Sequence, residues 1–316
     1  MLKDCSKGIK ISAVKVVCAA LALGLLSACG DSGGGGIPVD NSKYSGVSAR
    51  ADITLANAVA FTSDAYAAGS IGASQNLIGV MVKADADVCT LPEIATLLQK
   101  SATVGMAQQS GAPVLTGVAT TQTIYGAAGG SYSLSWDRDQ ATGNFSGKVT
   151  YSNYKAVTSG PTISGTVTMT GAYNDSTARY ESITMVFSPL SVTSESNTAN
   201  LYGSFAFSTE GASQMLRISC TMHVNPGKCY WIKDWTYNFS SGKLTVTGVY
   251  YHPSYGYVEM TTPTPLTTTS LSGMPTAGVF QAAGGHCTKG RMTFSAAGSI
   301  VTACVEGSTE WLACTE

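Results

Sequence analysis

Cysteine and histidine are the residues of this 316-residue chain with the most specific chemistry, because they can form disulfides or bind metal. Cys220, His223 and Cys229 fall within ten residues, and thiolate and imidazole ligands suit zinc. His286 and Cys287 could complete such a site. The spacing matches no closed structural zinc site, however, and no closely spaced cysteine pair is followed by the histidine that covalent haem attachment requires. We therefore expect no metal and no cofactor.

The N-terminal segment resembles a bacterial lipoprotein signal. Four lysines and one acid in residues 1–15 precede an apolar run over residues 16–28, which is too short to span a bilayer. The run ends in a lipobox, Leu26-Ser27-Ala28-Cys29. The resemblance implies that residues 1–28 are removed and that Cys29 carries diacylglycerol and further acyl chains such as palmitate. Gly30 behind it implies sorting to the outer membrane, where several acyl chains give firm anchorage.

Export has a consequence for the remaining cysteines. Six lie beyond the signal, and an even count in an oxidising compartment favours disulfides; they are Cys89, Cys220, Cys229, Cys287, Cys304 and Cys314. Six cysteines allow 15 complete pairings, which sequence cannot separate. Our preferred set joins Cys220 to Cys229, Cys287 to Cys304, and Cys89 to Cys314.

A stripe of aromatic residues is the candidate for ligand binding. On strict alternation Trp231, Trp235 and Tyr237 share one strand face with Phe239 and Lys233. Rings on a flat face can stack on sugars or on other rings at small entropic cost. The candidate ligand-binding residues are Trp231, Trp235, Tyr237, Tyr250, Tyr255 and Tyr257. The alternative is that these rings fill the core, since aromatic residues are also good strand formers.

Catalytic signatures are few. Three histidines, His223, His252 and His286, lie in or beside expected strands and turns with no nucleophile motif near them. No glycine-rich loop precedes a helix in the setting that nucleotide binding requires. We expect no catalytic residues, with a hydrolase assembled from distant residues as the least favoured reading.

The candidate residues are positioned by a chain that we divide into four segments. We expect a signal peptide (1–28), a lipidated glycine-rich tether (29–43), a mostly helical segment (44–118) and an antiparallel β domain (119–316). Within the third part, a short strand is expected at 52–55, and Thr90-Leu91-Pro92-Glu93 is a capping box. The fourth part alternates polar and apolar residues. Strands are expected at 131–136, 145–151, 163–169, 180–187, 200–208, 215–224, 230–239, 245–251, 278–281, 291–294 and 300–305.

The expected fold is therefore mainly β: a curved antiparallel sheet or a β-sandwich, with a small N-terminal helical segment packed on it (α+β overall). The glycine tether, Tyr44-Ser45-Gly46 and Thr262-Pro263-Thr264-Pro265 also resemble poorly characterised β-rich bacterial surface lipoproteins. That resemblance implies location and architecture only.

The amino-acid composition limits the classes of molecule that this chain could bind. Charged residues make up only 12% of the chain and the formal net charge is −1, so no electrostatic footprint for nucleic acid exists. Four basic residues and one acid lie in residues 1–28, which leaves a mature charge of about −4. We expect a noncatalytic outer-membrane lipoprotein that serves adhesion, envelope structure or assembly with a protein partner and faces the periplasm or the cell surface. The alternative is a module that binds glycan or an amphiphile.

Overall fold

The computed structural model describes residues 41–58, 62, 65–66, 98, 120–139, 141–156, 158, 161–174, 176, 179–194, 197–224, 227–269 and 275–314. These residues belong to one compact unit, Ile37–Glu316. A short 3-10 helix, η1 (Asn41–Lys43), opens it. Among the described residues, no helix has the length and apolarity needed to cross a membrane.

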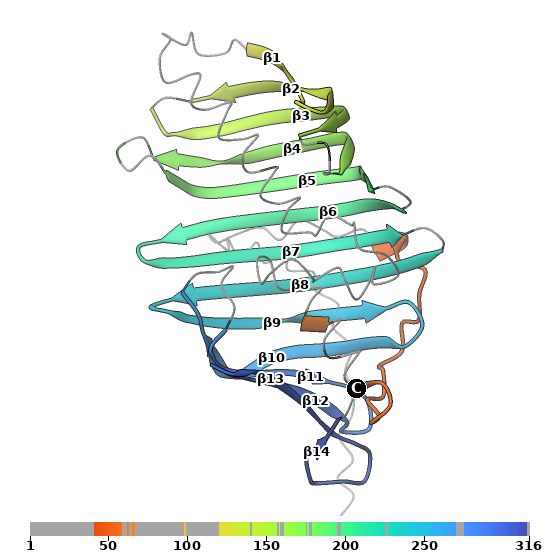
Figure 1. The fold of residues 1–316 in the computed structure, drawn as a ribbon. Helices are drawn as coiled ribbons and strands as arrows, with labels where there is room; N and C mark the ends of the chain where they lie inside the picture. The colour runs from red at the N-terminus through yellow and green to blue at the C-terminus, as the bar shows by residue number, and fades with distance from the viewer. Residues whose placement is uncertain are drawn as a thin grey trace, which may run out of the picture. The chain divides into compact units, whose positions relative to one another are not determined.

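In the described part of the chain, fourteen antiparallel strands form one open sheet in the order of the chain (Figure 1). The first seven are β1 (Thr120–Tyr125), β2 (Gly129–Arg138), β3 (Asn144–Lys155), β4 (Thr162–Asn174), β5 (Arg179–Ser194), β6 (Asn197–Glu210) and β7 (Ser213–Val224). The second seven are β8 (Lys228–Ser240), β9 (Lys243–His252), β10 (Gly256–Thr267), β11 (Ala277–Ala283), β12 (Lys289–Ser295), β13 (Gly298–Cys304) and β14 (Leu312–Ala313).

The mainly β prediction is confirmed, and a single open sheet replaces the sandwich alternative. All eleven expected strands are present. The sequence reasoning missed β1, β10 and the two-residue β14. β10 contains Pro263 and Pro265 and accommodates them with register shifts. The strand expected at 52–55 is wrong, because Thr54 instead begins a turn that bonds to Asn57 and Ala58.

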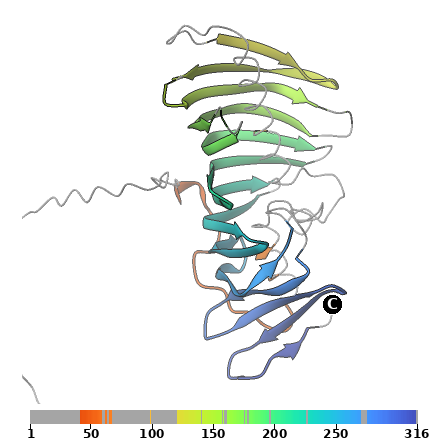
Figure 2. The same ribbon diagram turned by 90° about the vertical axis from the view of Figure 1, so that its left-hand side faces the viewer.

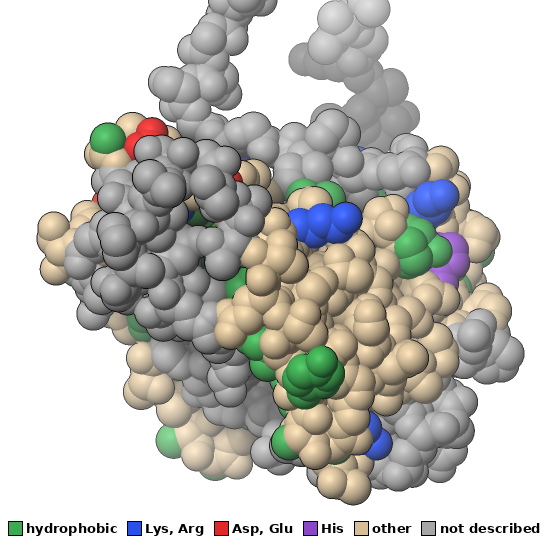
Figure 3. All heavy atoms as spheres, turned by 90° about the horizontal axis from the view of Figure 1, so that it is seen from above, with side chains coloured by type: hydrophobic (Ala, Val, Ile, Leu, Met, Phe, Trp, Pro, Cys, Tyr) green, Lys and Arg blue, Asp and Glu red, His purple; other side chains and the backbone are tan. Residues whose placement is uncertain are grey.

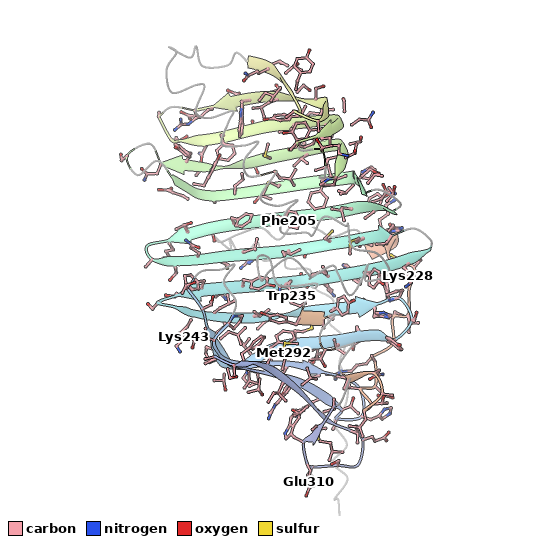
Figure 4. The ribbon with its side chains drawn as sticks, viewed as in Figure 1. Phe205, Lys228, Trp235, Lys243, Met292 and Glu310 are labelled. Atoms are coloured by element: carbon pink, nitrogen blue, oxygen red, sulfur yellow. The ribbon has the colours of Figure 1, made fainter. Side chains whose placement is uncertain are left out.

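Alternation gives the sheet two distinct faces. The core face carries apolar residues from β2 to β12, including Val149, Met185 and Phe205, each with less than 2% of its area exposed (Figure 4). The outer face of β2 to β5 carries mostly serine and threonine. Figure 2 shows these strands one above another in the upper part of the sheet.

Most of the predicted helical segment, 44–118, lies outside the described residues, and so does the capping box at Thr90. Tyr66 and Leu98 are described, and both are buried in the core. The Tyr66 ring contacts Phe280 and Phe294, with centroids 5.1 and 5.2 Å away. This segment therefore contributes to the core, while its helical character remains a prediction. The predicted signal peptide, Cys29 and nearly all of the predicted tether also lie outside the described residues.

Candidate functional site

The predicted aromatic stripe is divided between the two faces of the sheet. Trp235, Tyr237 and Tyr250 lie on the core face, with 0, 2 and 0% of their area exposed (Figure 4). Trp231 and Tyr257 lie on the outer face. Tyr255 occupies the β9–β10 turn, half exposed and stacked on His252 at 4.5 Å between centroids. The prediction that Trp231 and Trp235 share a face is therefore wrong.

The cause is a β-bulge in β8. Ile218 pairs with Trp235 and Cys220 pairs with Ile232, so β8 contains one residue more than β7 over this stretch. Asp234 takes up the extra residue with φ +51°, a left-handed conformation that aspartate tolerates. Alternation restarts behind it, and Trp235 turns to the core. An aspartate inside a strand pattern was the available sequence signal.

One cross-strand row on the outer face gathers the remaining rings. Tyr202 on β6 pairs with Thr221 on β7, and Thr221 pairs with Trp231 on β8. Trp231 pairs with Tyr251 on β9, which in turn pairs with Tyr257 on β10. Ring centroids are 4.5 Å apart for Trp231 and Tyr251 and 5.1 Å apart for Tyr251 and Tyr257. We call these five residues the outer row.

An N-terminal strap, residues 43–51, covers part of the outer row. Its Tyr44 ring lies 5.8 Å from the Trp231 ring and 5.3 Å from the Tyr251 ring. Lys43 Nζ lies 5.6 Å from the Tyr202 centroid, a cation–π contact. Trp231 consequently retains only 7% exposure. Sequence reasoning did not include Tyr44, Tyr202, Thr221 or Tyr251 in the site.

Hydrogen bonds fix the strap in place. Tyr257 donates its N–H to Ala49 O (2.9 Å) and accepts from Ala51 N (2.8 Å), so the strap runs beside β10. Tyr44 Oη lies 2.9 Å from Val47 O and 3.1 Å from His252 O and shares its proton between them. The Tyr44 hydroxyl occupies the place where a side chain at position 46 would have its Cβ, so Gly46 is required for this arrangement.

Two buried polar atoms of the outer row make no hydrogen bond within the part of the chain that the structure describes. Trp231 Nε1 and Thr221 Oγ1 are both shielded from solvent, and Thr221 is fully buried. An unpaired buried polar group costs free energy. Because Thr221 pairs with Trp231, the indole N–H donor of Trp231 lies beside a hydroxyl that can donate or accept a hydrogen bond.

A thiol–imidazole pair lies beside the row. Cys229 Sγ is 3.5 Å from His223 Nε2 and 3.4 Å from Lys43 O. Burial raises the pKa of the Cys229 thiol, opposed by hydrogen bonds from Ser45. The thiol therefore stays protonated at neutral pH, which removes the nucleophilic form.

Two of the preferred disulfides are wrong. Cys220, Cys229, Cys287, Cys304 and Cys314 are all free thiols. Cys220 lies on the core face and Cys229 on the outer face, so no bond can join them across the turn. The same separation keeps Cys220 away from the metal alternative with His223 and Cys229. Burial raises the pKa of Cys220 to about 12.

Cys304 lies in the last residue pair between β12 and β13, and Cys287 lies outside that pairing. Cys304 pairs with Lys289 and donates its S–H to Ser308 O, whereas Cys287 lies exposed in the loop before β12. In the third predicted pair, Cys89 with Cys314, Cys314 is a free thiol and Cys89 lies outside the described residues.

One histidine meets a carboxylate. His286 Nδ1 lies 2.9 Å from Asp52 Oδ1, and this bond raises the pKa of His286. Both side chains are largely exposed, at 66% and 47%, so they lack the desolvation that tunes catalytic pairs. Gly285 N also donates to Ala51 O, so the contact fastens the β11–β12 loop to the end of the strap.

Comparison of this chain with protein-family models, with curated proteins and with solved structures finds no match. The site must therefore be judged on its geometry.

Proposed function

We propose that this chain is a noncatalytic lipoprotein, anchored to the outer membrane through Cys29, that recruits another envelope protein by strand addition to the outer edge of β1. The lipobox at 26–29 supports the anchor. The exposed edge of β1 is the observation that supports recruitment. Whether the body faces the periplasm or the cell surface depends on where that partner resides.

β1 has the properties of a docking edge. Among the described residues, its only strand partner is β2, with six consecutive pairs and no register shift. Its sequence, Thr-Thr-Gln-Thr-Ile-Tyr, contains no charge and no proline, the devices that usually block edge pairing. Tyr125 is 80% exposed. An extended peptide can satisfy the free backbone groups of such a strand.

The opposite edge of the sheet differs. β14 has only two residues, Leu312 and Ala313, and pairs with β13 through two positions. A short edge offers few backbone groups to a partner. Figure 3 views the chain from the β1 side, where the described surface is mostly uncharged. The uncharged surface beside β1 favours a partner segment that is rich in hydroxyl and apolar side chains.

The noncatalytic part of the proposal is supported by the two histidine contacts. His286 and Asp52 are solvent-exposed, and the Cys229 thiol beside His223 is held protonated by burial. The first pair therefore lacks a desolvated setting, and the second lacks the thiolate that nucleophilic catalysis requires.

Site-specific photo-crosslinking in intact cells tests the docking edge. A benzophenone amino acid replacing Tyr125 should give a discrete protein adduct, whereas the same probe replacing the exposed Tyr255 should not. Thr121→Lys with Thr123→Lys should reduce the adduct about tenfold, because lysines on an edge strand oppose pairing. Thr168→Lys, on the outer face of the interior strand β4, is the matched control. Equal adducts from both probe positions would refute the proposal.

The anchor is tested separately. Radiolabelled palmitate should enter the wild-type chain, and Cys29→Ser should abolish labelling and release the protein from the membrane fraction. A chain that fractionates with the membrane in both forms would contradict lipid anchorage and leave the edge proposal standing.

A further inference from the structure

The free backbone groups of β1 can be assigned from its pairing with β2. Beyond Tyr125 the pairing continues to Gly126, whose N–H donates to Gly130 O at 3.0 Å. Because the peptide groups of successive residues in an antiparallel strand point to opposite sides, the even-numbered residues of β1 bond to β2 and the odd-numbered residues point to the open edge. Three residues therefore present an N–H and a C=O at that edge: Thr121, Thr123 and Tyr125.

We propose that the partner at β1 is a second copy of this chain, whose own β1 pairs antiparallel to the first about a two-fold axis at Thr123. This inference rests on the proposed strand addition and names its partner. In this register Thr123 faces Thr123 of the second copy, and Thr121 faces Tyr125 of the second copy. Three pairs of two hydrogen bonds, six in all, use every free group of both edges. A shift by two residues would leave one of the three residues without a partner in β1.

The side chains across this contact repeat combinations that the sheet already contains. At the axis a threonine meets a threonine, as Thr150 meets Thr166 on the same outer face with hydroxyl oxygens 3.4 Å apart. Tyr125 meets Thr121, a small hydroxyl residue, as it already meets a serine of β2. β1 contains no charged residue, so the two copies do not repel each other along the shared edge.

The two edges of the sheet favour a closed pair of chains. In the part of the chain that the structure describes, β1 and β14 are the outermost strands (Figure 1). Pairing of β1 with β14 of the next copy would build an open filament. β14 pairs with β13 at only two positions, so it is too short to match the free groups of β1. Pairing of β1 with β1 uses both of these edges at once, and assembly stops at two chains.

The symmetry of the pair agrees with the proposed lipid anchor. A two-fold axis normal to the sheet keeps the outer faces of both copies on the same side. The strap lies on that face, with Lys43 against the Tyr202 ring. Both copies therefore present the strap on one side, as two chains anchored in one membrane require. A contact of one strand pair is small for a protein interface, and anchorage raises the effective concentration at which two copies meet.

Cysteine cross-linking of the lipidated mature chain in phospholipid vesicles tests the register. Cys287→Ser first removes an exposed thiol. In that background Thr123→Cys should give a covalent dimer on oxidation with copper phenanthroline, because Cα atoms of a hydrogen-bonded pair are about 5.5 Å apart, within disulfide reach. Ser133→Cys, in the same row on β2, is the control, since its two copies would lie roughly 14 Å apart and should give a yield about tenfold lower. No dimer from Thr123→Cys, or equal yields from both variants, would overturn the proposal.

Photo-crosslinking in intact cells identifies the partner. The benzophenone probe replacing Tyr125 should give an adduct of twice the mass of the chain, and mass spectrometry should find only peptides of this chain in it. Thr123→Lys should reduce this adduct about tenfold, because it places two like charges at the axis, whereas Thr150→Lys on the outer face of β3 should not. An adduct with a different polypeptide overturns the self-pairing and leaves strand addition at β1 standing. The absence of any adduct overturns both.

Discussion

The outer faces of β2–β5 and of β8–β10 are built on the same sheet but present different surfaces. Across the first region, hydroxyl residues stand in register, as in Ser133, Thr150 and Thr166. Across the second, Trp231, Tyr251 and Tyr257 stand in register, and the strap lies over them. The core faces of both regions are mainly apolar. Only the outer face distinguishes the two regions.

This difference shows that β8–β10 carries large side chains on both faces, with a bulge at Asp234 that separates Trp231 from Trp235. Trp231 lies on the outer face of β8, so it is not required to fill the core. Three sets of substitutions test this contrast, beginning with the largest expected effect.

The two tryptophans of β8 should differ in their contribution to stability. Trp235→Ala leaves a cavity in the core and should lower the free energy of unfolding by roughly 3–5 kcal/mol. Trp231→Ala should cost about 1–2 kcal/mol, because only the strap packs over it. Urea unfolding at an unchanged m-value measures both. Equal losses would mean that the outer row is part of the core.

Acid should weaken β8–β10 before β2–β5. Burial, with Lys228 nearby, lowers the pKa of His252 from 6.5 to about 4, so the unfolded chain binds more protons between these values. The contribution of His252 to stability is complete above pH 6.5 and is lost as the pH falls towards 4. Allowing for partial exposure, the loss is on the order of 1–2 kcal/mol.

Hydrogen exchange at pH 7 and pH 4.5 should show faster exchange in β9 and β10, while β3 and β4, which contain no histidine, change less. His252→Gln should remove the difference between the two regions. His286→Gln is a control of opposite sign, because a raised pKa gives stability that is lost as the pH rises.

The smallest effect concerns two threonines on the same outer face. Thr221→Val should raise the free energy of unfolding by about 0.5–1 kcal/mol, because it removes a buried hydroxyl without a partner. Thr168→Val, at an exposed position of β4, should change it by less than about 0.5 kcal/mol. Thermal unfolding of both variants tests this. A destabilised Thr221→Val would indicate that the hydroxyl has a partner in solution.

Alternation predicted most of the strands because serine and threonine face water while valine, isoleucine and aromatic residues face the core. β10 could not be predicted from its Thr-Pro repeats, because pairing with β9 and β11, not local propensity, holds it in the sheet. The early segment was harder to predict. Residues 43–53 are positioned by contacts to β10 and the β11–β12 loop, which no local pattern in the sequence indicates.

The candidate site was predictable only in part. Trp231 and Tyr257 were found from residue type, and the consecutive rings Tyr250 and Tyr251 indicate that one must face outward. The bulge was not located, although an aspartate at position 234 within a strand pattern was a signal for it, so Trp235 was assigned to the wrong face. Tyr44 was beyond sequence reasoning, because its partners lie some 200 residues away along the chain.

The order of the strands also determines when each contact can form. Every strand pairs with its neighbour in the chain, so the sheet can grow by short loop closures as the polypeptide emerges. The bond between Arg50 and Glu259 spans 209 residues and cannot form until nearly the whole protein has been made. Residues 43–51 are thus among the last of the described residues to reach their final positions, and a nascent chain interrupted before β10 would lack the strand that fixes the strap beside the rings of β8 and β9.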